Sequence, residues 1–285
     1  MEMWFSEYHT KDVKHSIRVT RHLYAKKSDY QQIDIFETPE YGRVLALNGN
    51  VQLTERDEFI YDEMITHVPM AVHKGIQDIL VIGAGDGGVV RELTRYDRVK
   101  RIDLVEMDPQ VVEACREFLP GNACRMDDRR VHIFFENALR FIRRCEAEYD
   151  LIIVDSTDPF GPSEGLFTRE FYGSCYNALK DDGIMVNQQG SPFYAHDAEA
   201  MQRSHKRIVE TFPISKVYQA HIPTYAAGYW LFGFASKKYH PIDDVDQKSW
   251  LALNLHTRYY TPRLHVGAFA LPSFLEDMLL EVENR

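Results

Sequence analysis

The chain has 285 residues and a formal net charge of −10, with 45% hydrophobic and 27% charged residues. This length is enough for a large core and one or two domains, and the acidic balance argues against a nucleic-acid surface while it suits cationic ligands. No apolar run approaches the roughly 20 residues that span a bilayer, and the N-terminus lacks a basic region followed by an apolar one. We therefore expect a cytoplasmic globular protein without a membrane partner.

The metal-ligating residue types show no recognisable spacing. The 12 histidines contain no His-Glu-x-x-His pattern, and the 4 cysteines are scattered at Cys115, Cys124, Cys145 and Cys175. We expect these thiols to be reduced and buried as small apolar side chains, and we expect no bound metal.

The N-terminal segment alternates apolar and polar residues with a period of two, as in 17–19 and 33–35. This pattern predicts antiparallel strands, and the Asn48-Gly49 pair between two apolar runs predicts a hairpin. We expect residues 1–55 to form a small β domain and residues 56–285 to form a second, larger domain.

A helix is predicted where the two parts meet. Residues 54–58 supply a cap and an acidic first turn, and apolar residues recur at helical spacing from Ile60 to Pro69. The polar side of this amphipathic helix is either solvated or, beside Tyr61, the wall of a pocket for a cation. Its acids are Glu55, Asp57, Glu58, Asp62 and Glu63.

After this helix, short apolar runs alternate with helical patterns, which indicates a Rossmann-like, doubly wound parallel sheet of the methyltransferase type with right-handed crossovers. Strands are predicted at 79–82, 101–105, 131–135, 151–154, 184–186 and 229–235. Helices are predicted from about 89, 109 and 137, and over 168–179, 197–209 and 271–282.

The predicted strand 151–154 ends in carboxylates, Asp155 and Asp158. In open α/β sheets, ligands bind beyond the carboxyl ends of the strands, so both acids should face a pocket. Two acids three residues apart on such a loop could serve proton transfer, cation binding or metal binding.

A glycine loop, Gly83-Ala84-Gly85-Asp86-Gly87-Gly88, follows a predicted strand, and Glu106 ends the next strand 18 residues after Gly88. Together they predict a ligand with an adenosine part, whose ribose hydroxyls the acid accepts. Asp86 would repel a pyrophosphate, which disfavours NAD. A sulfonium has no phosphate, and decarboxylated S-adenosylmethionine, which keeps only the ammonium, suits Asp86 best.

Several blocks resemble the polyamine aminopropyltransferases, most closely the spermidine synthases, over nearly the whole chain. The run 55–59 and the pair Asp155 and Asp158-Pro159 are specific, whereas the glycine loop is shared with many methyltransferases. The matching blocks are 30–31, 42–49, 54–64, 83–88, 155–159, 222–225, 258–260 and 268–272.

The resemblance implies transfer of an aminopropyl group from decarboxylated S-adenosylmethionine to a diamine, usually putrescine, with release of methylthioadenosine. Asp155 is the implied base. The implied amine-binding residues are Tyr61, Asp62, Asp158, Gln189 and Tyr225. The implied residues of the nucleoside co-substrate site are Gln31, Gly83, Gly85, Asp86, Glu106, Asn137 and Ala138. The family usually associates through its N-terminal β domain, which implies a homodimer or homotetramer. No tightly bound cofactor is implied.

Elementary chemistry agrees with a base at Asp155. An alkylamine has a reference pKa near that of lysine, about 10.4, so exposing its lone pair at pH 7 costs roughly 4–5 kcal/mol unless a base removes the proton. Because the sulfonium is already a good leaving group, positioning should dominate the catalysis.

The sequence departs from the family pattern at three positions. Ala84 stands where the family usually has glycine, and it should fit if its φ is negative. Ala138 follows Asn137 where relatives often have Asp-Gly. Asp62 stands where bacterial relatives often have histidine. If Asp62 faces the channel, the acceptor could be another amine, such as cadaverine, agmatine or spermidine; otherwise it is a solvated helix residue.

Three other readings remain open. One is an S-adenosylmethionine methyltransferase with the same nucleotide fold, and a second is a polyamine-binding protein without catalysis. The run Gly161-Pro-Ser163-Glu-Gly165 matches the nucleophile elbow of hydrolases, but the serine stands well beyond the strand end, so a lid at Phe160–Gly165 is the more natural interpretation.

Overall fold

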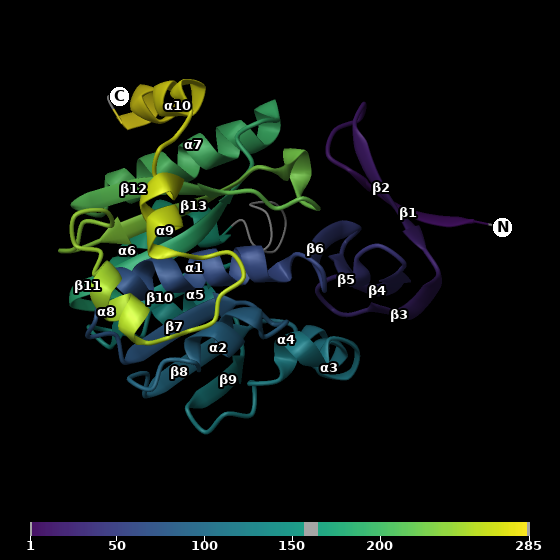
Figure 1. Cartoon of the computed structure of the whole chain (residues 1–285), viewed down its shortest axis with the longest axis horizontal. Coiled ribbons are helices and arrows are strands. Elements are labelled where there is room, and N and C mark those ends of the chain that lie inside the picture. The colour runs from purple at the N-terminus through teal and green to yellow at the C-terminus, as the bar shows by residue number, and fades with distance from the viewer. Residues whose placement is uncertain (1, 157–164, 284–285) are drawn as a thin grey trace.

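The computed structural model describes residues 2–156 and 165–283. Within these ranges the strands form three sheets, of two, four and seven strands (Figure 1). The two N-terminal sheets lie beside the large sheet, whose helices cover both of its faces. None of the helices in these ranges combines the length and the apolar character that a membrane crossing requires.

The N-terminal segment is antiparallel throughout, as predicted. The two-stranded sheet pairs β1 (Met3–Tyr8) with β2 (Lys14–Val19). The four-stranded sheet runs in chain order through β3 (Arg21–Lys27), β4 (Gln32–Thr38), β5 (Gly42–Leu47) and β6 (Asn50–Thr54). The predicted hairpin is confirmed between β5 and β6, where Asn48 and Gly49 both have positive φ (50° and 82°), the backbone that such two-residue turns require.

The large sheet has the order β12-β13-β11-β10-β7-β8-β9. β11, β10, β7, β8 and β9 are parallel neighbours, which confirms the predicted doubly wound sheet, whereas β13 runs antiparallel to β11 and β12. β12 had not been predicted. The bounds are β7 (Asp78–Gly83), β8 (Arg101–Glu106), β9 (Val131–Phe135), β10 (Tyr149–Asp155), β11 (Leu179–Gly190), β12 (Ile214–Ala220) and β13 (Trp230–Ser236).

Alternate residues of each buried strand pack on opposite faces of the sheet. In β7, Ile79 and Val81 pack in the cluster that contains α1, α2 and α8, while Leu80 and Ile82 pack with α5 and α6. The bounds are α1 (Glu58–Val72), α2 (Gly88–Leu93), α3 (Pro109–Phe118), α4 (Pro120–Ala123), α5 (Ala138–Ile142), α6 (Arg169–Ala178), α7 (Ala195–Val209), α8 (Gln247–Ala252), α9 (Pro262–Ala268) and α10 (Ser273–Glu283), with a 3₁₀ turn at Ala226–Gly228.

Helix α1 differs from the prediction in its ends and in its surroundings. It begins at Glu58 and passes through Pro69 to Val72. The prediction of a solvated polar side is wrong for Asp57, Asp62 and Glu63, which are 5%, 5% and 3% exposed. The C-terminal part of the chain covers Glu63, whose carboxylate accepts the backbone N–H groups of 258–260 at 2.7–2.8 Å.

Helix α3 joins the four-stranded sheet to the large one. Its residues Val111 and Cys115 pack with Ile33, Ile35 and Leu45 of β4 and β5. This contact places the β5–β6 hairpin beside the carboxyl ends of the parallel strands. The four cysteines are unpaired; Cys124 is exposed, so the prediction of burial is wrong for it and confirmed for the other three.

Candidate active site

A cavity of about 300 Å³ opens at the carboxyl ends of the parallel strands, between them and the β5–β6 hairpin. Among the described residues, its lining contains nine acids and no lysine, arginine or histidine. The acids are Glu7, Asp57, Glu58, Asp62, Asp86, Glu106, Glu136, Asp155 and Asp197. Such a wall attracts cations and repels anions.

Asp155 is the last residue of β10 and lines this cavity. The hydroxyl of Tyr61, from α1, donates a hydrogen bond of 2.6 Å to Asp155 Oδ1. The pKa of Asp155 is raised to about 8: burial raises it most, the charges of Asp86 and Glu106 also raise it, and the Tyr61 hydrogen bond opposes them. A carboxyl group with this pKa titrates close to neutral pH, the range in which a general acid or base works best.

The glycine loop is fixed directly against the Asp155 backbone. Gly83 has φ +82°, and a Cβ there would lie 1.8 Å from the Asp155 carbonyl oxygen, so only glycine fits. The N–H of Ala84 donates to this same oxygen at 3.2 Å. Ala84 was predicted to fit if its φ were negative; its φ is +58°, so this alanine lies in the left-handed region that favours glycine.

Glu106 is the last residue of β8, as predicted, and Asp86 lies in the loop between β7 and α2. Asp86 Oδ1 accepts the N–H of Gly88 at 2.9 Å, and burial raises the pKa of Asp86. Glu106 Oε1 accepts the N–H of Asp108 at 2.8 Å, and burial raises the pKa of Glu106 to about 7. Glu106 Oε2 would lie 2.9 Å from a Cβ on Gly85, so the missing side chain of Gly85 leaves room for this acid.

The remaining residues of the predicted nucleoside site line the same cavity. Gln31 donates from Nε2 to Asp108 Oδ2 at 3.1 Å and thereby ties the β3–β4 loop to the start of α3. Asn137 caps α5, since its side-chain oxygen accepts the N–H of Arg140 at 3.2 Å, and Ala138 is the first residue of that helix. The role of Asn137 toward adenine stays a prediction.

Three of the predicted amine-binding residues, Tyr61, Gln189 and Tyr225, line the same cavity as Asp155. The rings of Tyr61 and Tyr225 are 6.0 Å apart, and the Tyr225 hydroxyl donates to the Gln52 carbonyl of β6. Gln189 of β11 is 5% exposed, and neither polar atom of its side chain has a hydrogen-bond partner among the described residues. Such a group is ready to bind a ligand. Asp158, Ser163 and most of the Phe160–Gly165 segment lie outside the described residues.

Asp62 also lines the cavity, but it has a protein partner. Arg91 of α2 lies 3.4 Å from Asp62 Oδ2 and 2.6 Å from Glu58 Oε2. Burial, followed by the charges of Glu58 and Asp86, raises the pKa of Asp62 well above its usual range. The alternative of a solvated helix residue is wrong, because α2 covers this side of α1.

Sequence reasoning missed several residues around the cavity. Arg91 gave no signal, since its contacts depend on how α1 and α2 pack. Asp108, which accepts from Ser28 at 2.6 Å and from Gln31, had one available signal, an acid directly before Pro109 at a helix start. Among residues 2–156 and 165–283, no three His, Cys, Asp or Glu side chains are grouped as metal ligands.

Two family models match the chain. The spermine/spermidine synthase domain matches residues 58–247, and the spermidine synthase tetramerisation domain matches residues 3–55. A curated polyamine aminopropyltransferase from Alkaliphilus oremlandii is 58% identical over 284 residues, which cover 100% of both chains.

Two crystal structures are similar over nearly the whole chain. Spermidine synthase in complex with the transition state analogue AdoDATO has a TM-score of 0.95 at 41% identity, and covers 98% of this chain and 95% of its own. Spermidine synthase from Thermotoga maritima has a TM-score of 0.94 at 41% identity, with 98% and 94% covered. On these matches and the site geometry, the chain belongs to the spermine/spermidine synthase family of polyamine aminopropyltransferases.

Proposed function

We propose that this aminopropyltransferase transfers the aminopropyl group of decarboxylated S-adenosylmethionine to putrescine, giving spermidine and methylthioadenosine. The amine lone pair forms a bond to the carbon beside the sulfonium. The bond between that carbon and sulfur breaks, its electron pair goes to sulfur, and sulfur becomes a neutral thioether. The acceptor's ammonium gives its proton to Asp155 as its nitrogen attacks, which frees the lone pair that forms the new bond.

The observation that carries this proposal is the unbalanced charge of the cavity. Nine acids and no cationic side chain form its described lining, and Asp155 lies within it. Both proposed substrates are cations without a carboxylate. Their positive charges would lower the pKa of Asp155 from about 8 and favour its ionised form, so binding should produce the base that the reaction needs.

On this proposal, Tyr61 orients the Asp155 carboxylate, and Gln189 and Tyr225 bind the acceptor amine together with Asp158. The unpartnered side chain of Gln189 supports this role, because an ammonium or amine there would satisfy its buried oxygen. Positioning of the two substrates supplies most of the rate, since the leaving group is already activated.

The donor would occupy the opposite part of the cavity. Asp86 would bind its ammonium, and Glu106 would accept the ribose hydroxyls, as an acid at this strand end commonly does. The backbone at Gly83 and Gly85 would lie close to the donor, with Gln31, Asn137 and Ala138 at its nucleoside. The matching structure that contains AdoDATO supports a donor of this shape.

We also propose that residues 1–55 form an oligomerisation domain that borders the pocket, and that residues 56–285 form the catalytic domain. The match of residues 3–55 to a tetramerisation domain supports this division. So do three large apolar side chains on β1, because Met3, Trp4 and Tyr8 are 47%, 55% and 66% exposed in one chain. Sedimentation equilibrium should give a dimer or a tetramer, and a monomer would contradict the proposal.

The function is tested by one assay. Purified protein is incubated with decarboxylated S-adenosylmethionine and putrescine, cadaverine, agmatine or spermidine in turn, and methylthioadenosine release is measured with the mass of the amine product. We expect putrescine to have the highest kcat/KM and its product to gain one aminopropyl group. A product heavier by one methyl group, or no release with any amine, would overturn the proposal.

A further inference from the structure

The carboxylates of Asp62 and Asp86 both lie against Gly88, the first residue of α2. Asp86 Oδ1 accepts the N–H of Gly88 at 2.9 Å. Asp62 Oδ2 lies so close to the other side of Gly88 that a Cβ there would be 1.9 Å from it. Asp62 therefore lies beside Asp86, on the glycine-loop side of the cavity, although its chain neighbour Tyr61 contacts Asp155.

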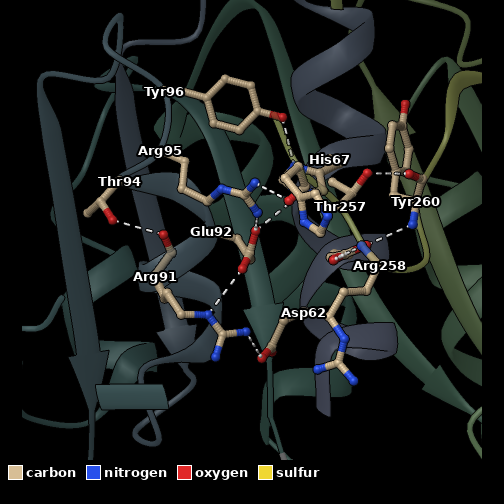
Figure 2. Close-up of polar contacts among 12 residues, drawn as sticks. Asp62, His67, Arg91, Glu92, Thr94, Arg95, Tyr96, Thr257, Arg258 and Tyr260 are labelled. Carbon is tan, nitrogen blue, oxygen red and sulfur yellow. Dashed lines mark hydrogen bonds and ion pairs between the residues drawn. The ribbon is translucent and has the colours of Figure 1, made fainter. Parts of the chain in front are cut away.

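Arg91 contacts both Asp62 and Glu92 (Figure 2). One guanidinium nitrogen contacts Glu58 and Asp62 at 2.6 and 3.4 Å, and Nε donates to Glu92 Oε1 at 3.1 Å. Arg91 is not among the residues that line the cavity, whereas Glu58 and Asp62 both are. Glu58 and Asp62 therefore contact the cavity, whereas the Arg91 guanidinium that pairs with them does not.

Arg91 is the cationic partner of Asp62 in this cluster. Buried carboxylates beside one another resist ionisation, and a nearby guanidinium favours the ionised form. The pKa of Asp62 is raised first by burial, then by Glu58 and Asp86, and Arg91 opposes this shift. Removing Arg91 should therefore leave Asp62 more protonated and a weaker partner for a cation.

We propose that Asp62 binds the primary ammonium of the sulfonium donor together with Asp86, and that Arg91 is the positioning residue that keeps Asp62 in place. This inference rests on the proposed function. It assigns Asp62 to the donor, whereas the family resemblance implied that Asp62 binds the acceptor amine. Two acids at this point also select against S-adenosylmethionine, because its carboxylate would stand beside them.

The first test separates the two assignments of Asp62. Asp62→Asn should weaken binding of decarboxylated S-adenosylmethionine about tenfold or more, as expected for loss of a charge-assisted hydrogen bond, measured by titration calorimetry. Methylthioadenosine, which lacks the ammonium, should bind within about twofold of wild type, and the KM of putrescine should change little. Asp62→Ser gives the same comparison if Asp62→Asn does not fold.

The second test concerns Arg91. Arg91→Met should weaken donor binding about fivefold or more without a matching loss for methylthioadenosine, and Arg91→Lys should restore part of it because the charge returns. Arg95→Met is the matched control: Arg95 pairs with the same Glu92 but contacts neither Glu58 nor Asp62. It should change donor binding by less than about twofold, even if it lowers the melting temperature.

If Asp62→Asn raises the KM of putrescine and leaves donor binding unchanged, Asp62 binds the acceptor amine and the inference is overturned. Equal losses for the donor and for methylthioadenosine in Arg91→Met would reduce Arg91 to a structural role. Either result leaves the proposed function intact, which fails only if wild-type protein releases no methylthioadenosine with any amine.

Discussion

Asp57 and Thr224 are joined by two hydrogen bonds in the wall of the cavity: Asp57 Oδ2 accepts the backbone N–H of Thr224 at 3.1 Å and its hydroxyl at 2.7 Å. The other oxygen of Asp57 accepts the hydroxyl of Thr54 at 2.5 Å. Asp57 directly precedes α1, which carries Tyr61, and Thr224 directly precedes Tyr225. This pair therefore fixes the distance between the two tyrosines that flank the proposed acceptor.

Asp57→Ala should be strongly destabilising, because it leaves buried donors of Thr54 and Thr224 without an acceptor. We expect the free energy of unfolding in urea to fall by about 3 kcal/mol, and the putrescine KM to rise in the protein that remains folded. Glu40→Ala is the control, since the ion pair of Glu40 with Arg56 is exposed and should change stability by less than about 0.5 kcal/mol. Equal effects of the two substitutions would contradict this account.

Tyr61→Phe tests the link between α1 and the proposed base. The Tyr61 hydroxyl lowers the pKa of Asp155, so its loss should raise that pKa and move the acidic limb of the kcat/KM profile to higher pH. At pH 7 we expect kcat/KM to fall about tenfold, since less Asp155 is ionised and its carboxylate is less well oriented.

Tyr225→Phe provides the comparison for that profile. The Tyr225 hydroxyl donates to the Gln52 carbonyl and not to Asp155, so its loss should leave the position of the acidic limb unchanged even if the KM of the amine rises. An unchanged limb in Tyr61→Phe, or an equal shift in both variants, would argue against Asp155 as the group that titrates.

The sequence predicted those strands and turns whose formation depends on neighbouring residues alone. The alternation around Ile33, the Asn48-Gly49 turn and the apolar run before Asp155 each follow from short-range rules of backbone geometry and burial. The acid at the end of β8, Glu106, was found in the same way, because a strand followed by a helix places its last residue at the ligand edge.

Contacts between distant segments could not be predicted in this way. The acids of α1 looked like a solvated face because their partners lie far along the chain: Glu63 binds backbone groups 195–197 residues later, and Asp57 binds Thr224 167 residues later. The place of Asp62 beside Asp86 depends on Gly88 having no side chain and on the packing of α2, neither of which periodicity reveals.

Ala84→Gly should stabilise the protein, because glycine adopts the φ of +58° found at Ala84 without steric cost. An L-residue in this region costs about 1–2 kcal/mol, partly offset by the greater freedom of glycine in the unfolded chain, so a net gain of about 0.5–1 kcal/mol is expected. Ala71→Gly, inside α1, should have the opposite sign and lose about 1 kcal/mol or more. Calorimetric melting of both variants checks the prediction, and a loss of stability in Ala84→Gly would contradict it.

Asp155→Asn should abolish turnover and yet stabilise the empty protein at alkaline pH. The folded pKa of Asp155, about 8, lies above the ordinary value of about 4, so between these pH values the folded state binds more protons than the unfolded state. The free energy of unfolding must then fall as pH rises through this window, and the loss is complete above the folded pKa.

Asparagine removes this dependence. At pH 8 we expect Asp155→Asn to exceed wild type by about 1–3 kcal/mol in urea titrations, with little difference near pH 4. Asp128→Asn is the control of opposite sign: the Arg130 guanidinium lowers the pKa of Asp128 to about 2, so its stabilisation is present at neutral pH and lost as pH falls toward that value. A difference between Asp155→Asn and wild type that does not change with pH would exclude Asp155 as a group with a raised pKa, and with it the base proposed for this reaction.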